Sequence, residues 1–114
     1  MTAFVLGVLA MAGVVLTPVT VTATAYSCEN HPNNRMYPCN TTRWGYDPLQ
    51  PGAACPPQWA HTAIYVPKRG VMTCDDSGRY DSLYGLPHVD IRVTSHDEAV
   101  QWGIREIVIY RISD

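Results

Sequence analysis

The sequence predicts a small all-β domain with one short helix and a loop supported by disulfides. Three observations carry this prediction. The chain has 114 residues, which suits a single domain with one modest core. Its clearest patterns are short segments in which β-branched and polar residues alternate with the period of a strand. Its four cysteines indicate disulfides that supplement a small core.

Residues 1–18 are predicted to be an N-terminal apolar segment of the signal-peptide kind. An apolar run from Ala3 to Leu16 ends at Thr17-Pro18. The run is shorter than the roughly 20 residues that a membrane-spanning helix needs, and Ala10-Met11-Ala12 would serve as a cleavage site. An uncleaved anchor and a buried helix of a cytosolic protein are the alternatives. We expect residues 19–114 to form a secreted or cell-envelope domain with no stable membrane span.

The first strand is predicted at Val19 to Ser27 (VTVTATAYS), where β-branched and small residues alternate. From Cys28 to Pro57 the chain is crowded with Asn, Pro and Gly, which predicts a long irregular loop. Trp44, Tyr46 and Trp59 lie in or beside this loop. Aromatic residues there are either binding elements or plugs that pack the loop onto the domain.

The cysteines are Cys28, Cys39, Cys55 and Cys74. Sequence alone allows three connectivities, and loop closure favours nearest neighbours, Cys28 with Cys39 and Cys55 with Cys74, each worth about 2–4 kcal/mol. A zinc site is the alternative. No cysteines have C-x2-C spacing and the histidines lack H-x3-5-H spacing, so no metal or other cofactor is predicted.

A β-hairpin is predicted next, with strands at Ala63 to Val66 and Val71 to Cys74 joined by the turn Pro67 to Gly70. Alternation resumes at His88 to Val93, where every second residue is apolar. Asp90 therefore points away from the apolar face of its strand.

The end of the chain predicts a helix and a closing strand. Ser95 and Glu98 have the spacing of a capping box, in which each side chain bonds the other residue's amide. The helix should end before Gly103. Arg105 to Ile112 (REIVIYRI) is rich in β-branched residues and predicts the last strand.

The charge balance argues against nucleic acid or an anionic membrane surface as the partner. The chain has eight Lys and Arg residues and ten Asp and Glu residues, which gives a net charge of −2, and no basic block occurs. We expect a monomer.

Several blocks of the sequence, in order, resemble the three-aspartate (3D) domain family. They are VTATAYS near the start, P-x-x-G-V-x-T-x-x-D-S-G at Pro67 to Gly78, V-D-I at Val89 to Ile91, and S-H-D-E-A-V-x-W-G at Ser95 to Gly103. The family includes the catalytic region of the membrane-bound lytic transglycosylase A type and small exported peptidoglycan-active proteins. The resemblance covers about Val19 to Ile112 and implies a double-psi β-barrel of six strands with a short helix.

The resemblance also implies an activity. The family cleaves peptidoglycan glycan strands between N-acetylmuramic acid and N-acetylglucosamine, with a 1,6-anhydro sugar as product. One carboxyl group can act first as acid and then as base, and a second carboxylate nearby would raise its pKa. The D-S-G motif places Asp76 on the family's middle aspartate and V-D-I places Asp90 on the last. Strand alternation allows only one of Asp75 and Asp76 to face a cleft, and the motif selects Asp76.

The chain differs from the family pattern at the first aspartate. The matching segment here reads Ala54-Cys55-Pro56-Pro57, without an acid. Asp47 lies in a similar segment displaced upstream and would supply the third acid if the loop folds back. The loop from Ser77 to Val89 is also longer than the family's tight turn.

These residues leave three functions open. The first is a peptidoglycan lytic transglycosylase-like enzyme that uses Asp76 and Asp90. The second is a non-catalytic carbohydrate-binding module on the same barrel, and the third is a structural domain whose aspartates only make turns. Arg79 would meet substrate carboxylates or pair with Asp81. The aromatic residues expected to stack on sugar rings are Trp44, Trp59, Tyr80 and Tyr84.

Overall fold

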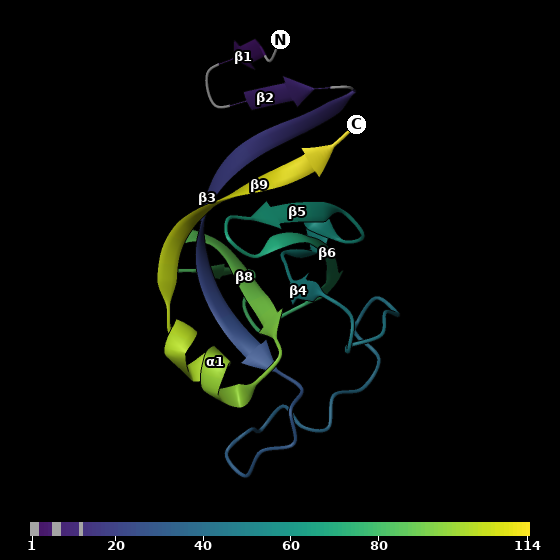
Figure 1. The fold of residues 1–114 in the computed structure, drawn as a ribbon, viewed down its shortest axis with the longest axis vertical. Coiled ribbons are helices and arrows are strands. Elements are labelled where there is room, and N and C mark those ends of the chain that lie inside the picture. Colours follow the sequence, from purple (N-terminus) through teal and green to yellow (C-terminus); the bar gives the residue numbers. More distant parts are fainter. Residues whose placement is uncertain (1–2, 6–7, 12) are drawn as a thin grey trace.

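The computed structural model describes residues 3–5, 8–11 and 13–114. Its elements in chain order are β1 (Ala3–Val5), β2 (Val8–Met11), β3 (Val14–Ser27), β4 (Gly52–Ala54), the 3-10 turn η1 (Pro57–Trp59), β5 (Ala63–Val66), β6 (Gly70–Asp76), β7 (Ser82–Leu83), β8 (Leu86–Val93), α1 (His96–Trp102) and β9 (Arg105–Ser113). The predicted all-β domain with one short helix is confirmed (Figure 1).

Six of the strands close into a barrel in the order β3-β9-β5-β6-β4-β8, with β8 pairing back to β3. The β3–β8 and β4–β6 pairs are parallel, and the other four pairs are antiparallel. Both parallel pairs join strands that are not consecutive, as the crossings of a double-psi topology require. Closure gives each of the six strands a neighbour on both sides, so most of the edges that an open sheet would expose are paired. The predicted small six-stranded barrel is therefore confirmed.

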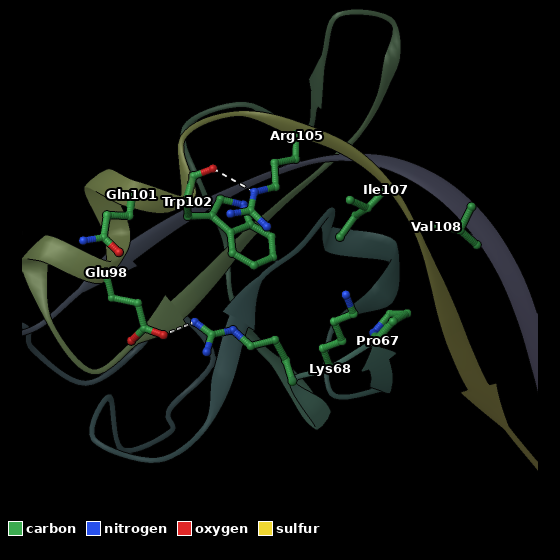
Figure 2. A pocket seen from close by; sticks show the side chains of 9 residues that line it. Pro67, Lys68, Glu98, Gln101, Trp102, Arg105, Ile107 and Val108 are labelled. Carbon is green, nitrogen blue, oxygen red and sulfur yellow. Dashed lines mark hydrogen bonds and ion pairs between the residues drawn. The ribbon is translucent and has the colours of Figure 1, made fainter.

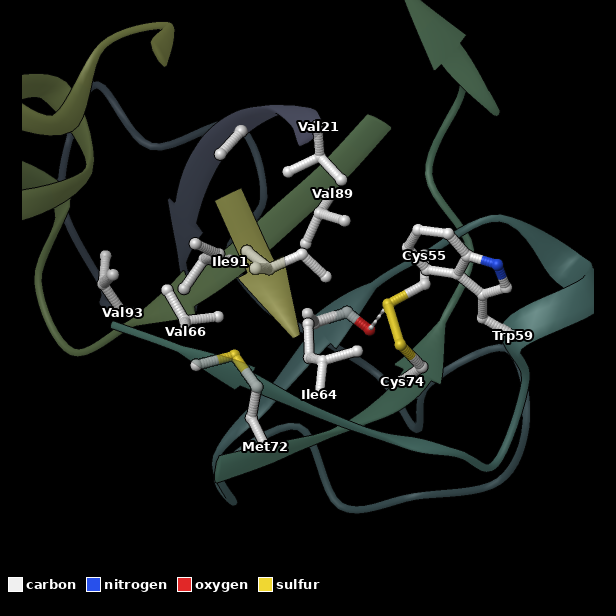
Figure 3. Close-up of a cluster of buried hydrophobic side chains, with 13 residues drawn as sticks. Val21, Cys55, Trp59, Ile64, Val66, Met72, Cys74, Val89, Ile91 and Val93 are labelled. Atoms are coloured by element: carbon white, nitrogen blue, oxygen red, sulfur yellow. Dashed lines mark hydrogen bonds between the residues drawn. A yellow bond between two sulfur atoms is a disulfide. The ribbon is translucent and has the colours of Figure 1, made fainter. Parts of the chain in front are cut away.

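The barrel interior is filled by alternate residues of the strands (Figure 3). On β8 the apolar residues predicted to share one face, Val89, Ile91 and Val93, are all buried. They meet side chains from the other strands, including Val21, Ile64, Val66 and Ile109. Because successive side chains of a strand alternate in direction, the polar residues between them face outward.

Both predicted disulfides are present. Cys28 and Cys39 are joined with their Cα atoms 5.4 Å apart, and Cys55 and Cys74 with theirs 5.5 Å apart. The second bridge lies in the core beside Trp59 (Figure 3). The first bridge connects two points of the loop that follows β3, so this loop is supported by a disulfide as predicted.

The first barrel strand begins earlier than predicted. β3 starts at Val14 rather than Val19, and its pairing with β9 begins at Val15. The proposed cleavage site ends at Ala12, which lies outside the described residues, so it stays a prediction. Within the described ranges, no helix is both long and apolar enough to cross a membrane.

Two short strands lie in segments expected to be loops. β4 is inserted between β6 and β8, and its own sequence, Gly-Ala-Ala, carries no strand signal. β7 forms a small hairpin with the start of β8. Tyr84 and Gly85 make its turn with φ of 56° and 77°, the left-handed values that tight two-residue hairpin turns need.

Candidate functional site

A polar face runs along the outside of the parallel pair β3 and β8. The register sets Thr22 opposite His88, Thr24 opposite Asp90, and Tyr26 opposite Arg92. Residues opposite each other in a ladder lie on the same side of the sheet. The alternation that sends the apolar residues inward thus gathers these polar side chains on the other side of the sheet, where Thr22 and Tyr26 are buried and the residues of β8 are half-buried.

The inserted strand β4 brings Asp76 beside this face. Ala54 is the register partner of Asp76 on β6 and also of Asp90 on β8. The strand β4 therefore lies between the strands that carry the two acids, which places their backbones two strand spacings, roughly 10 Å, apart. The register puts these two predicted site residues on the same side of the sheet, and the negative charge of Asp76 contributes to raising the pKa of Asp90.

Asp90 has the properties of an acid that holds its proton. Its side chain is half-buried, and this burial raises its pKa above the usual range for aspartate, with the charge of Asp76 adding to the effect. A hydrogen bond from Thr24 and the positive charge of His88 act in the opposite direction. A carboxyl group in such surroundings is suited to donating a proton.

A chain of hydrogen bonds links Asp90 to His88 through a hydroxyl group. Thr24 Oγ1 lies 2.9 Å from Asp90 Oδ1 and 2.8 Å from His88 Nε2. His88 Nδ1 lies 3.0 Å from the carbonyl oxygen of Tyr80. A carbonyl only accepts hydrogen bonds, so Nδ1 carries a proton in this contact.

The Thr24 hydroxyl has one proton and two partners, so it allows two states. When Asp90 is ionised, Thr24 donates to it. When Asp90 is protonated, it can donate to Thr24, whose own proton then turns to His88 Nε2. The hydroxyl group thus couples the carboxyl group to the imidazole ring.

Asp76 is held at the edge of the loop that follows β3. Its Oδ1 accepts hydrogen bonds from the amides of Arg43, at 2.8 Å, and Ser77, at 2.9 Å. A cavity of about 270 Å³ contains Asp76 and Tyr26 and is walled by the loop segment 35–48. A second hollow of about 140 Å³ contains Ser77, together with Arg43 from the same loop. Asp76 thus lines one hollow and its chain neighbour Ser77 lines the other, an arrangement that suits an extended ligand.

Asp75 lies in a β-bulge and not in a regular strand position. The register passes from Ala53 opposite Cys74 to Ala54 opposite Asp76, which leaves Asp75 as an extra residue. The bulge interrupts the strict alternation on which the choice between the two acids is based. Of the two, Asp76 lines a hollow, as expected, while Asp75 is buried. Asp75 is buried and forms a two-point ion pair with Arg92, at 2.6 and 3.1 Å.

Arg92 connects this ion pair to the cavity. It also donates to the hydroxyl of Tyr26 at 3.0 Å and to the carbonyl of Gln50 at 2.6 Å. Burial raises the pKa of Tyr26 to about 12, so its hydroxyl stays neutral at working pH. Gly52 makes this packing possible, because a Cβ atom there would collide with the side chains of Asp75 and Arg92.

Two of the predicted site residues lie elsewhere. Asp47 is exposed, and its Oδ1 accepts a hydrogen bond from the amide of Leu49 in its own turn. In the described part of the chain, no hydrogen bond or ion pair joins Asp47 to Asp76 or Asp90. Trp59 is 5% exposed and packs in the core under Arg111. The prediction that Trp59 stacks on sugar rings is therefore wrong: its side chain packs the loop onto the core.

The remaining aromatic residues are accessible. Trp44 is half-buried at the smaller hollow and 6.1 Å from the ring of His61. Tyr80 and Tyr84 are 52% and 75% exposed on the hairpin loop. Arg79 stacks on Tyr80, with its guanidinium 5.4 Å from the ring centre.

Sequence reasoning missed the partners of the two acids, namely Thr24, Tyr26, Asp75 and Arg92, and gave His88 no role. A signal was present, since polar residues occupy every second position both in the VTATAYS block and in His88–Arg92. The pattern identifies two outward faces. Their alignment depends on a register between distant strands that neither segment encodes alone.

Among the described residues, no group of three or more His, Cys, Asp or Glu side chains is placed to hold a metal ion. No protein-family model matches the chain, and no curated protein matches it.

Proposed function

We propose that this protein is a peptidoglycan lytic transglycosylase-like enzyme of the three-aspartate domain type, with Asp90 as its general acid and base. The observation that carries the proposal is the half-buried Asp90, whose pKa is raised and whose strand is separated from that of Asp76 by the short strand β4. In many glycan-cleaving enzymes, two carboxyl groups in unlike surroundings take different catalytic roles.

In the proposed reaction, protonated Asp90 donates its proton to the oxygen of the bond between N-acetylmuramic acid and N-acetylglucosamine. The bond breaks, the glucosamine leaves as an alcohol, and positive charge develops on the muramic ring. The ionised Asp90 then removes the proton of the muramic C6 hydroxyl, whose oxygen attacks C1 and closes the 1,6-anhydro ring. Atoms and protons balance without water as a reactant.

Asp76 has a different part in this proposal. Its Oδ1 is fixed by two amides, so its orientation is set before a substrate arrives. A carboxylate held in this way can stabilise the positive charge of the oxocarbenium-like state. The two hollows beside it would hold sugar units on either side of the cleaved bond.

The decisive experiment is digestion of purified peptidoglycan, with the released fragments analysed by mass spectrometry. We expect fragments with anhydromuramic ends from the wild-type protein and far fewer from Asp76→Asn, while Asp97→Asn, an exposed acid of α1, serves as the matched control. Reducing ends in place of anhydro ends would show that water is the nucleophile. Binding to the polymer with no released fragment would overturn the enzyme assignment.

Replacement of His88 tests the hydrogen-bonded chain. The positive charge of His88 lowers the pKa of Asp90, so His88→Gln removes that effect and raises this pKa further. Activity that needs protonated Asp90 is lost as pH rises through its pKa. We therefore expect the alkaline limb of the pH–rate profile to move to higher pH in His88→Gln and to stay in place in His96→Gln. An unchanged limb with normal folding would remove His88 from the mechanism.

A non-catalytic glycan-binding module is the second candidate, and the exposure of Tyr80 and Tyr84 favours it. Aromatic side chains standing free of the surface are suited to stacking on sugar rings. For a binding module, Tyr80→Ala with Tyr84→Ala should weaken retention on insoluble peptidoglycan while the aspartate variants bind normally. The enzyme predicts a loss of product in the aspartate variants instead.

The proposed site of action is the cell envelope. Two disulfides are typical of proteins that fold in oxidising compartments. The proposed partner is the glycan strands outside the membrane. The protein is proposed to act on them as a monomer.

A further inference from the structure

A groove of about 620 Å³ lies on a part of the barrel that shares no lining residue with the hollows at Asp76. Three elements form it: the turn between β5 and β6, the helix α1, and the first half of β9 (Figure 2). Nothing in the proposed glycan chemistry uses this surface.

The groove has an excess of two positive charges. Lys68, Arg69 and Arg105 line it, against the single carboxylate of Glu98. Arg69 pairs with Glu98 at 2.5 Å. Among the described residues, no carboxylate pairs with Lys68 or Arg105, so two cations face solvent.

Trp102 holds one of these cations in place and forms an apolar wall. Its indole Nε1 donates to the carbonyl of Ala23 at 3.1 Å, which fixes the ring against the barrel. The guanidinium of Arg105 lies 4.1 Å from the ring centre, and its Nε donates to the Trp102 carbonyl at 2.9 Å. The terminal amino groups of Arg105 are thereby presented in a fixed position, as an arginine that recognises carboxylates requires.

The backbone of β9 is free on the side of the groove. On one edge, β9 pairs with β3 over Arg105–Ser113. On its other edge, β5 pairs only with Tyr110, Arg111 and Ile112. In the described part of the chain, residues 105–109 thus have one edge without a strand partner, and Ile107 and Val108 of this segment line the groove. An unpaired edge exposes backbone donors and acceptors to which another strand can add.

We infer that this groove binds an extended peptide segment of a partner protein that carries carboxylate side chains. The peptide adds as a strand to the free edge of β9, its carboxylates meet Lys68 and Arg105, and its apolar side chains lie against Trp102. The combination of free edge, uncompensated cations and apolar wall matches this class of partner. The site is independent of Asp76 and Asp90.

The first test uses a blocked five-residue peptide that alternates valine and glutamate, carries a fluorophore, and is titrated against the full chain by fluorescence anisotropy. We expect binding that weakens as salt screens the charges, and much weaker binding of the matching lysine peptide. A glutamate peptide with N-methylated backbone amides should lose about tenfold or more in affinity, because it keeps the charge but not the strand hydrogen bonds.

The second test compares variants of the chain. Lys68→Gln combined with Arg105→Gln should raise the dissociation constant about tenfold or more, while Arg79→Gln, an exposed arginine outside the groove, should leave it unchanged. Equal binding of the lysine peptide, no binding up to millimolar concentration, or unchanged binding by the double variant would overturn the inference. So would dimerisation through the same edge of β9 without any peptide, because the occupant would then be a second copy of the chain.

Discussion

Asp90→Asn should reduce the release of anhydro fragments from peptidoglycan by about 10²–10⁴-fold, the usual contribution of a positioned proton donor. Asparagine has nearly the same shape and can still accept the hydrogen bond from Thr24, so the fold is retained. Only the transferable proton is lost. The measurement is the initial rate of product formation, with Asp97→Asn as a control that makes the same substitution away from the site.

The same substitution should have an opposite effect on stability. Burial raises the pKa of Asp90 in the folded state, so between its unfolded and folded pKa values the native protein binds more protons than the unfolded chain. Stability therefore falls as pH rises through that window. Asp90→Asn should be at least as stable as wild type above the window and should lose this pH dependence. A variant that loses both activity and stability at neutral pH would indicate a structural role for Asp90.

Asp75→Asn should destabilise the fold by about 3–5 kcal/mol, since it leaves the charge of Arg92 buried without its partner. The side chains of Arg92 and Asp75 are only 4% and 2% exposed. A loss of this size is a large part of the roughly 5–15 kcal/mol that stabilises a typical domain. Urea unfolding at constant pH gives the free energy directly.

Gly52→Ala tests the same ion pair by a steric change. Its Cβ would collide with the Asp75 carboxylate and with Arg92, so we expect a loss of about 3 kcal/mol from overpacking and displacement of the pair. Gly78→Ala is the matched control, because its Cβ would make only an ordinary contact of 3.8 Å with Ala54. If Asp75→Asn and Gly52→Ala each cost less than about 1 kcal/mol, the ion pair is not what holds β4 in place.

Elements defined by neighbouring residues were predicted well. β5 has the predicted bounds, Ala63–Val66. The helix begins after Ser95, whose hydroxyl accepts from the Glu98 amide at 3.1 Å as expected. The other half of the capping box differs, because the Glu98 carboxylate pairs with Arg69 and accepts from Thr94. One carboxylate oxygen thus accepts from the amide of Thr94 in place of that of Ser95, and the other pairs with Arg69, a distant residue that no local pattern identifies.

The site itself depends on contacts that local patterns do not contain. β4 has three small residues and pairs with both β6 and β8. The bulge at Asp75 lies in this pairing, and the placement of Asp76 relative to Asp90 depends on it. Sequence motifs identified the two acids. The residues that hydrogen-bond to them or shift their pKa values could be identified only from the strand register of the barrel.

The pairing of β3 with β8 and β9 also has a kinetic consequence. Thr24 and Asp90 are 66 positions apart in the chain, and Trp102 bonds Ala23 across 79 positions. Such distant contacts must form together, which places folding of barrels like this in the range of milliseconds to seconds, far slower than helical domains of similar size. No early fragment of the chain contains both Thr24 and Asp90. The proposed peptidoglycan-cleaving activity therefore arises only after the last strands have been synthesised and have closed the barrel.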